Sequence, residues 1–200
     1  MRIPPLAPAW STTEWLNTPS PITLEQLRGR VVVLHAFQML CPGCVARGIP
    51  QMQRVAELFA REPLVVIGLH TVFEHHEAMR VESLRAFLHE YRVRFPVGVD
   101  APDPAGGPIP RTMKAYAMQG TPTTVLIDPD GRLRQRTFGV HDDLRLGASL
   151  AQLLGESKQA RGAAGENAPS QPARLGNDEH GSDDHGGDGP RCDEQGCVST

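Results

Sequence analysis

The chain has 200 residues, of which 40% are hydrophobic and 22% are charged, and its formal net charge is -3. This length suits one globular domain with a remainder. The slight excess of negative charge argues against a nucleic-acid-binding protein, which would carry a basic patch. No apolar run approaches the roughly 18 residues that a membrane-spanning helix needs. The first residues also lack the apolar core of a secretory signal. We therefore expect a cytoplasmic protein that does not insert into membranes.

Alternating strands and helices are predicted over the first three quarters of the chain. Apolar runs indicate strands at 31–37, 64–69 and 96–100, and a hairpin formed by 123–127 and 132–140. Helical spacing of apolar residues indicates helices at 44–61, 83–93, 112–118 and 142–154, the last ending at Gly155. This order predicts an α/β fold, in which a parallel first half is completed by an antiparallel hairpin and a covering helix.

Residues 156–200 differ in composition from the rest of the chain. They contain no Phe, Trp or Tyr, and nine acidic against four basic residues give them a net charge of -5. Such a segment cannot bury enough apolar surface to offset the entropy lost on ordering. We expect a folded domain over residues 1–155 and a tail over 156–200 that is disordered in isolation.

The most informative motif is Cys41-Pro42-Gly43-Cys44, which follows a predicted buried strand and opens a predicted helix. Backbone N–H groups at a helix start favour a thiolate at Cys41. Cys44 lies close enough in sequence to attack a mixed disulfide formed at Cys41. This context favours redox chemistry. The same spacing also supplies two zinc ligands, so half of a zinc site is the alternative.

From Trp10 to Leu154 the chain resembles the thioredoxin superfamily, in particular the TlpA/ResA-like thiol–disulfide oxidoreductases and the neighbouring redoxin (AhpC/TSA-like) group. The resemblance rests on four motifs in matching order: Leu24–Arg30, Cys41–Cys44, Thr121–Thr124 and Leu126–Gly131. It implies a thioredoxin-like fold, with a central mixed sheet flanked by helices. It also implies a redox-active Cys41–Cys44 disulfide and no required cofactor.

The resemblance assigns a substrate-binding role to four residues near the cysteines. In the family, the proline of the Thr-Pro pair is cis and faces the dithiol, and its neighbours hold an extended substrate backbone. The resemblance therefore implies this role for Thr121 and Pro122, together with Pro42 and Gly43 of the motif. An X-Pro bond is the one place where a cis peptide is accessible at low energy. The alternative for Pro122 is an ordinary proline at the start of a strand.

Four positions depart from the family pattern. Thioredoxins keep a buried Asp where this chain has His35, which is either a proton acceptor or a hydrogen-bonded core residue. Leu40 replaces the usual Trp before the first cysteine. In the family, the helix kinks at a proline eight residues after the first cysteine. Here Pro50 comes nine residues after Cys41, which leaves the register of this kink open. Arg47, where ResA-like proteins carry Glu, either favours the Cys41 thiolate or is a solvated helix residue.

A histidine cluster follows the second predicted strand. His70 ends that strand, and His75 and His76 follow in a loop with Glu74. Because ligand sites in parallel sheets lie at the carboxyl ends of strands, we expect this loop at the same edge as Cys41. The histidines would tune thiol pKa values, relay protons or bind a metal. Exposed histidines without a role are the alternative.

The tail carries a second pair of cysteines, Cys192 and Cys197, preceded by His180 and His185. Thiolates with imidazoles suit zinc, copper or nickel. A flexible dithiol would instead exchange with Cys41–Cys44. An inert tail is the third interpretation.

The leading hypothesis is a disulfide reductase acting on protein or small-molecule disulfides. Cys41 attacks the substrate disulfide, Cys44 resolves the mixed disulfide, and an upstream thiol reductant restores the pair. The reducing cytosol favours this direction. A thiol peroxidase is the first alternative, although the Pro-x-x-x-Thr/Ser-x-x-Cys motif of peroxiredoxins matches at neither cysteine. A metal-handling protein using the dithiol, the histidine loop and the tail is the second.

Overall fold

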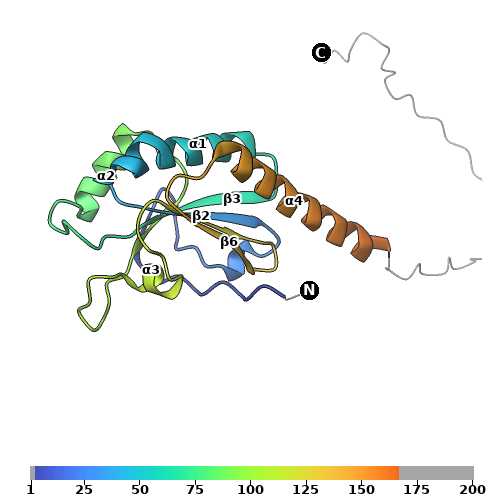
Figure 1. The fold of residues 1–200 in the computed structure, drawn as a ribbon, viewed down its shortest axis with the longest axis horizontal. Helices are drawn as coiled ribbons and strands as arrows, with labels where there is room; N and C mark the ends of the chain where they lie inside the picture. Colours follow the sequence, from blue (N-terminus) through green and yellow to red (C-terminus); the bar gives the residue numbers. More distant parts are fainter. Residues whose placement is uncertain (1–2, 167–200) are drawn as a thin grey trace, which may run out of the picture. The chain divides into compact units, whose positions relative to one another are not determined.

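The computed structural model describes residues 3–166, which form a six-stranded mixed sheet with helices on both faces (Figure 1). The sheet order is β1-β4-β3-β2-β5-β6. The strands are β1 (Thr12–Leu16), β2 (Val31–Phe37), β3 (Leu64–His70), β4 (Val97–Asp100), β5 (Thr123–Ile127) and β6 (Leu133–Phe138). The helices are η1 (Glu25–Leu27), η2 (Cys44–Gly48), α1 (Ile49–Leu58), α2 (Val81–Glu90), α3 (Arg111–Ala115) and α4 (Asp143–Glu166).

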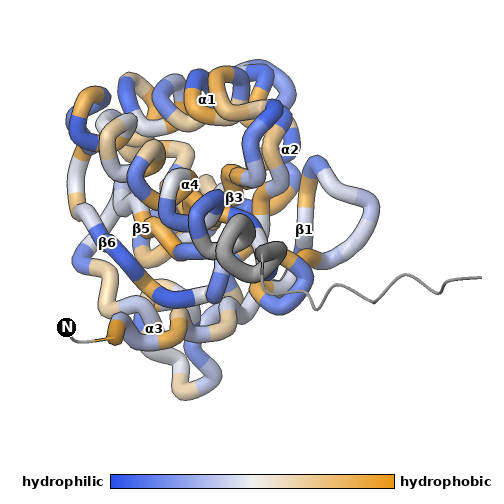
Figure 2. The backbone as a smooth tube through the Cα atoms, turned by 90° about the vertical axis from the view of Figure 1, so that its right-hand side faces the viewer, coloured by the Kyte–Doolittle hydropathy of each residue, from blue (hydrophilic) through white to orange (hydrophobic). Residues whose placement is uncertain are grey.

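The centre of the sheet is parallel and its flanks are antiparallel. β2 pairs in parallel with β3, and β3 with β4, whereas β5, β6 and β1 join in antiparallel register. This arrangement confirms the predicted thioredoxin-like α/β fold with a mixed sheet. The prediction missed β1, because its sequence Thr-Thr-Glu-Trp-Leu is short and only its last residue is buried. β6 at the opposite edge is mostly hydrophilic, in contrast to β5 (Figure 2).

Alternate residues of β2 supply two separate hydrophobic cores. Val31, Val33 and Phe37 face the side covered by α1, α2 and α4, whereas Val32 and Leu34 face the side of α3 and η1. All seven residues of β2 are buried. A strand covered on both faces must be apolar at nearly every position, so the single polar residue in it, His35, has to find its partners inside the protein.

The last helix is longer than the sequence suggested. α4 does not end at Gly155 but continues to Glu166, so that prediction was wrong. Contacts extend beyond the glycine: Glu156 pairs with Arg134 of β6 at 2.7 Å, and Ser157 is buried. A Cβ at Gly155 would meet nothing within 4 Å, so the glycine occupies an open helix face and does not cap the helix. The wider division into a folded domain and a tail stays a prediction.

Within residues 3–166, no helix combines the length and the apolar character needed to cross a bilayer.

Two glycines give opposite expectations for alanine substitution. A Cβ on Gly68 of β3 would lie 2.9 Å from Val97 and 3.1 Å from Phe95, whereas a Cβ on Gly147 of α4 would meet nothing within 4 Å. Gly68→Ala should lower the free energy of unfolding by about 1–3 kcal/mol through overpacking. Gly147→Ala should raise it by about 0.5–1 kcal/mol because alanine favours the helix. Urea denaturation of both variants measures these changes, and an unchanged or more stable Gly68→Ala protein would contradict the packing described here.

Candidate active site

The two motif cysteines lie in the turn that joins β2 to the first helix. The Cys41 N–H donates to the Gln38 carbonyl at 3.2 Å, and the Val45 N–H donates to the Cys41 carbonyl at 3.1 Å. These bonds hold Cys41 just ahead of η2, which begins at Cys44. Both thiols are free, with Cys41 half-buried and Cys44 fully buried. The turn therefore presents one sulfur atom to solvent and hides the other.

This difference in burial separates the acidities of the two thiols. Burial, together with the hydrogen bond to the Cys41 thiol, raises the pKa of Cys44 to about 12. Burial also acts to raise the pKa of Cys41, but hydrogen bonds from Cys44, Thr121 and the Gly43 backbone outweigh it. The net pKa of Cys41 is lowered from its ordinary value. Because the thiolate is the reacting species, Cys41 is the thiol of the pair better suited to act as a nucleophile.

The Thr121–Pro122 peptide bond is cis and lies beside the dithiol, as predicted. The Cys41 thiol donates to the Thr121 carbonyl at 3.4 Å. A Cβ built on Gly43 would lie 3.4 Å from Pro122 Cδ, so the proline ring sits directly against the Cys-Pro-Gly-Cys turn. The structure brings together Cys41, Gly43, Cys44, Thr121 and Pro122. Their role in holding a substrate stays a prediction.

His35 lies on the face of β2 that η2 covers, and it is 1% exposed. Its Nδ1 atom lies 3.1 Å from Thr124 Oγ1 of β5, while its Nε2 atom has no hydrogen-bond partner among the described residues. Nε2 is aimed at Gly48, since a Cβ there would approach it to 2.7 Å. Burial lowers the pKa of His35 to about 4, so its ring is neutral near neutral pH.

The helix after the dithiol begins with a π-helical turn over Cys44–Gly48. The Ile49 N–H donates to the Cys44 carbonyl, five residues back. A π turn accommodates one more residue than an α turn and is common at functional sites. It accounts for Pro50 lying nine rather than eight residues after Cys41. Pro50 is the second residue of α1, which continues from η2 without a break, so its missing N–H removes one backbone hydrogen bond from the helix at this point.

Arg47 and Leu40 both point to solvent. Arg47 is exposed and helps to lower the pKa of Asp143 across a hollow between η2 and the start of α4. It is not among the groups that shift the pKa of Cys41, so it is a solvated helix residue. Leu40 is 56% exposed immediately before Cys41, which places an apolar side chain at the edge of the dithiol.

Gln38, which the sequence analysis missed, links the dithiol turn to the loop after β3. Its side chain is 1% exposed, accepts the Phe73 N–H at 3.3 Å and donates to Glu74 Oε1 at 3.4 Å. The Gln38 carbonyl accepts the Cys41 N–H. A backbone hydrogen bond from Gln38 to the Cys44 thiol acts to lower the pKa of that thiol. The sequence did offer a signal for this residue. Gln38 is polar, directly follows an apolar strand and lies three positions before Cys41.

The histidine loop does not assemble as a ligand cluster. His70 is 1% exposed, with its ring 5.4 Å from that of Phe37 in the core, whereas His75 and His76 are exposed. Within residues 3–166, no group of three or more His, Cys, Asp or Glu side chains is placed to hold a metal ion. The other candidate ligands, His180, His185, Cys192 and Cys197, lie outside the described residues.

Two buried histidines make stability depend on pH. Burial lowers the pKa of both His35 and His70 from 6.5 to about 4. The unfolded chain therefore binds protons between about pH 6.5 and pH 4 that the folded chain does not. The contribution of each histidine to the free energy of unfolding is fully present above this window. It is lost as the pH falls through the window, by about 3 kcal/mol per histidine. His70→Leu should make this decline shallower.

Unfolding free energies from urea titrations at about pH 7 and about pH 4.5 measure this effect. His76→Gln, at an exposed histidine of the same segment, is the matched control and should decline like the original chain. Equal declines in all three proteins would show that burial of His70 does not set the pH dependence.

Comparisons with known proteins agree with this geometry. The AhpC/TSA family profile matches residues 6–136. A crystal structure of a thioredoxin-like superfamily protein is 55% identical, with a TM-score of 0.73, over 75% of this chain and 96% of that one. A thiol-disulfide isomerase from Corynebacterium glutamicum is 47% identical, with a TM-score of 0.70, over 74% of this chain and 96% of that one.

A curated relative is the thiol-disulfide oxidoreductase ResA of Bacillus thuringiensis subsp. konkukian. It is 27% identical over 119 residues, which are 59% of this chain and 60% of ResA. The chain spans between 12% and 60% of the length of the curated relatives that it matches. The family profile covers more than half of the chain, and the mixed sheet flanked by helices and the cis Thr121–Pro122 bond are as the resemblance implied. The chain belongs to the AhpC/TSA family, within the thioredoxin-like superfamily.

Proposed function

We propose that this chain catalyses thiol–disulfide exchange and acts as a disulfide reductase. The observation that carries the proposal is the pairing of a half-buried thiol of lowered pKa, Cys41, with a fully buried thiol, Cys44, whose pKa is raised to about 12. The first thiol is suited to attack. The second stays protonated and unreactive until a mixed disulfide has formed beside it.

The reaction has two exchange steps. The Cys41 thiolate attacks one sulfur of a substrate disulfide, whose S–S bond breaks, and the departing thiolate takes up a proton. Cys44 then loses its proton and attacks Cys41 Sγ. The Cys41–Cys44 disulfide forms and the second substrate thiol leaves, so two electrons have passed to the substrate. A thiol reductant must return two electrons to the pair before the next cycle. These exchange steps need no metal or cofactor.

The surroundings of Cys41 suggest how a substrate is held. Thr121 and Pro122 form one side of the dithiol turn, and Gly43 allows Pro122 to approach it closely. Leu40 provides an exposed apolar contact next to the reacting sulfur. We assign to Pro42, Gly43, Thr121 and Pro122 the binding of an extended backbone segment next to the disulfide. An unfolded or loop-borne protein disulfide would reach the half-buried Cys41 thiol more readily than a disulfide inside a folded core.

We also propose that His35 receives the proton of Cys44. Its neutral ring lies under η2, with Nε2 unpaired and Nδ1 held by Thr124. Burial raises the pKa of Cys44 and lowers that of His35, so the proton transfer is uphill and is expected to be transient, with the proton leaving as Cys44 attacks the mixed disulfide.

The names of the similar proteins support exchange chemistry, since two of them are described as a thiol-disulfide isomerase and a thiol-disulfide oxidoreductase. A reductase passes electrons to its substrate, and an isomerase uses the same first step. Peroxide reduction is the competing function within the redoxin group. A location in the cytoplasm stays a prediction.

The decisive experiment offers the reduced protein equal amounts of hydrogen peroxide and a test protein disulfide. Stopped-flow fluorescence and intact mass should show that the disulfide is consumed first and that Cys41 and Cys44 become linked. Cys44→Ser should accumulate a mixed disulfide through Cys41, because the resolving thiol is gone. Cys41→Ser is the matched control and should form none. Preferential consumption of peroxide, with a sulfenic acid at Cys41, would instead establish a peroxidase.

The role of His35 is testable through the second step alone. His35→Gln should slow the release of substrate from a preformed Cys41 mixed disulfide by about a hundredfold, the lower range for a lost general base. The attack of Cys41 on the disulfide should keep its rate. Thr124→Val, which removes only the hydrogen bond to Nδ1, is the structural control. Equal slowing of both steps would mean that His35 only supports the fold.

A further inference from the structure

The Gln38 side chain joins the end of β2 to the loop after β3. It is 1% exposed, although a side-chain amide both donates and accepts hydrogen bonds. Its oxygen accepts the Phe73 N–H at 3.3 Å, and its nitrogen donates to Glu74 Oε1 at 3.4 Å. A buried amide that lost these partners would be left unsatisfied, which costs more than the hydrogen bonds themselves contribute. The amide and the loop therefore hold each other in place.

Residues 72–79 form the loop that Gln38 holds. Met79 is buried and Phe73 packs against the core, whereas residues 74–78 are exposed. Among residues 3–166, Gln38 is the only residue outside positions 71–80 that forms a hydrogen bond or an ion pair with this loop. The hydrogen-bonded position of the loop relative to the end of β2 thus depends on one buried side chain.

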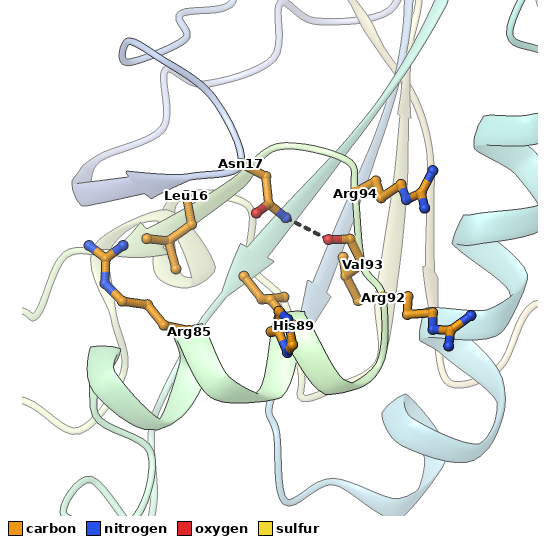
Figure 3. A pocket seen from close by; sticks show the side chains of 8 residues that line it. Leu16, Asn17, Arg85, His89, Arg92, Val93 and Arg94 are labelled. Atoms are coloured by element: carbon orange, nitrogen blue, oxygen red, sulfur yellow. Dashed lines mark hydrogen bonds between the residues drawn. The ribbon is translucent and has the colours of Figure 1, made fainter.

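The turn after α2 is tethered by two amide side chains and lies at the other edge of the sheet. Figure 3 shows the Asn17 side chain directed at the Val93 carbonyl, to which it donates at 2.8 Å. The Gln53 amide donates to the Tyr91 carbonyl of the same turn at 2.8 Å. This turn leads into the amino end of β4, which is parallel to β3 and β2, whereas the dithiol follows the carboxyl end of β2. A substitution at Gln53 therefore removes an amide tether at a distance from the dithiol turn.

The Gln38 backbone contacts both cysteines of the motif. Its carbonyl accepts the Cys41 N–H at 3.2 Å. Its backbone hydrogen bond to the Cys44 thiol acts to lower the pKa of that thiol, whereas Gln38 is not among the groups that shift the pKa of Cys41. Attack by Cys41 on an external disulfide needs an accessible thiolate. Attack by Cys44 on Cys41 Sγ is intramolecular, so its rate depends on how precisely the turn aligns the two sulfur atoms.

We propose that Gln38 is a positioning residue for the resolving step, in which its tethered backbone holds Cys44 in line with Cys41 Sγ. This inference rests on the proposed exchange function. In the resolving step the Cys44 thiolate forms a bond to Cys41 Sγ, and the bond between Cys41 and the substrate sulfur breaks. The substrate leaves as a thiolate, which takes up a proton. The Gln38 side chain acts on this step through the backbone that it fixes.

The test follows both exchange steps in one stopped-flow experiment. It uses the full-length protein with Cys192 and Cys197 replaced by serine, so that the motif cysteines alone react. The probe is dithiobis(nitrobenzoate), a small disulfide that releases one coloured thiolate when Cys41 attacks and a second when Cys44 resolves the mixed disulfide. Gln38→Met keeps the length of the side chain but loses both hydrogen bonds. It should slow the second release by about tenfold, the rate equivalent of one lost hydrogen bond, and leave the first release unchanged.

Further variants separate the hydrogen bonds from packing. Glu74→Ala, at an exposed position, removes one of the two bonds without disturbing the core and should slow the second release in the same direction. Gln38→Glu combined with Glu74→Gln keeps an acceptor for the Phe73 N–H and exchanges donor and acceptor between positions 38 and 74. This exchanged variant should restore the second release. Gln53→Met is the matched control and should leave both releases unchanged.

The outcomes distinguish this inference from the proposed function. An unchanged second release in Gln38→Met would overturn the inference and leave the exchange function in place. Equal slowing of both releases, or no recovery in the exchanged variant, would show that Gln38 only supports the fold. Failure of the original chain to release the second thiolate would overturn the exchange function, and this inference with it.

Discussion

The unequal solvation of two sulfur atoms three residues apart is the constraint around which the rest of this structure is arranged. Cys41 is half-buried and Cys44 is fully buried. Burial raises the pKa of Cys44, whereas at Cys41 hydrogen bonds outweigh the weaker effect of burial and lower the pKa. The difference in burial arises because β2 is covered on both faces, so the chain leaves the sheet inside the protein and reaches the surface only within the turn. The cis Thr121–Pro122 peptide then closes the turn from the side.

Much of the fold and the dithiol site was predictable because both depend on local signals. The continuous apolar runs of β2 and β3, the Cys-Pro-Gly-Cys motif between strand and helix, and the Thr-Pro pair before β5 each carry their own evidence. β1 was missed because a short edge strand with one buried residue shows little hydrophobic alternation. The π turn depends on backbone bonding that no residue type signals. His70 was expected near the thiols, but the pleat of β3 turns its ring into the core against Phe37.

The close approach of His35 to Gly48 has a consequence for how the sequence can vary. The imidazole fills the space that any larger residue at position 48 would require, since a Cβ there would come within 2.7 Å of Nε2. Position 48 therefore accepts a side chain only where position 35 carries a smaller group. Among homologous chains the two positions should change together, and a library that randomises position 48 alone would return mostly destabilised proteins.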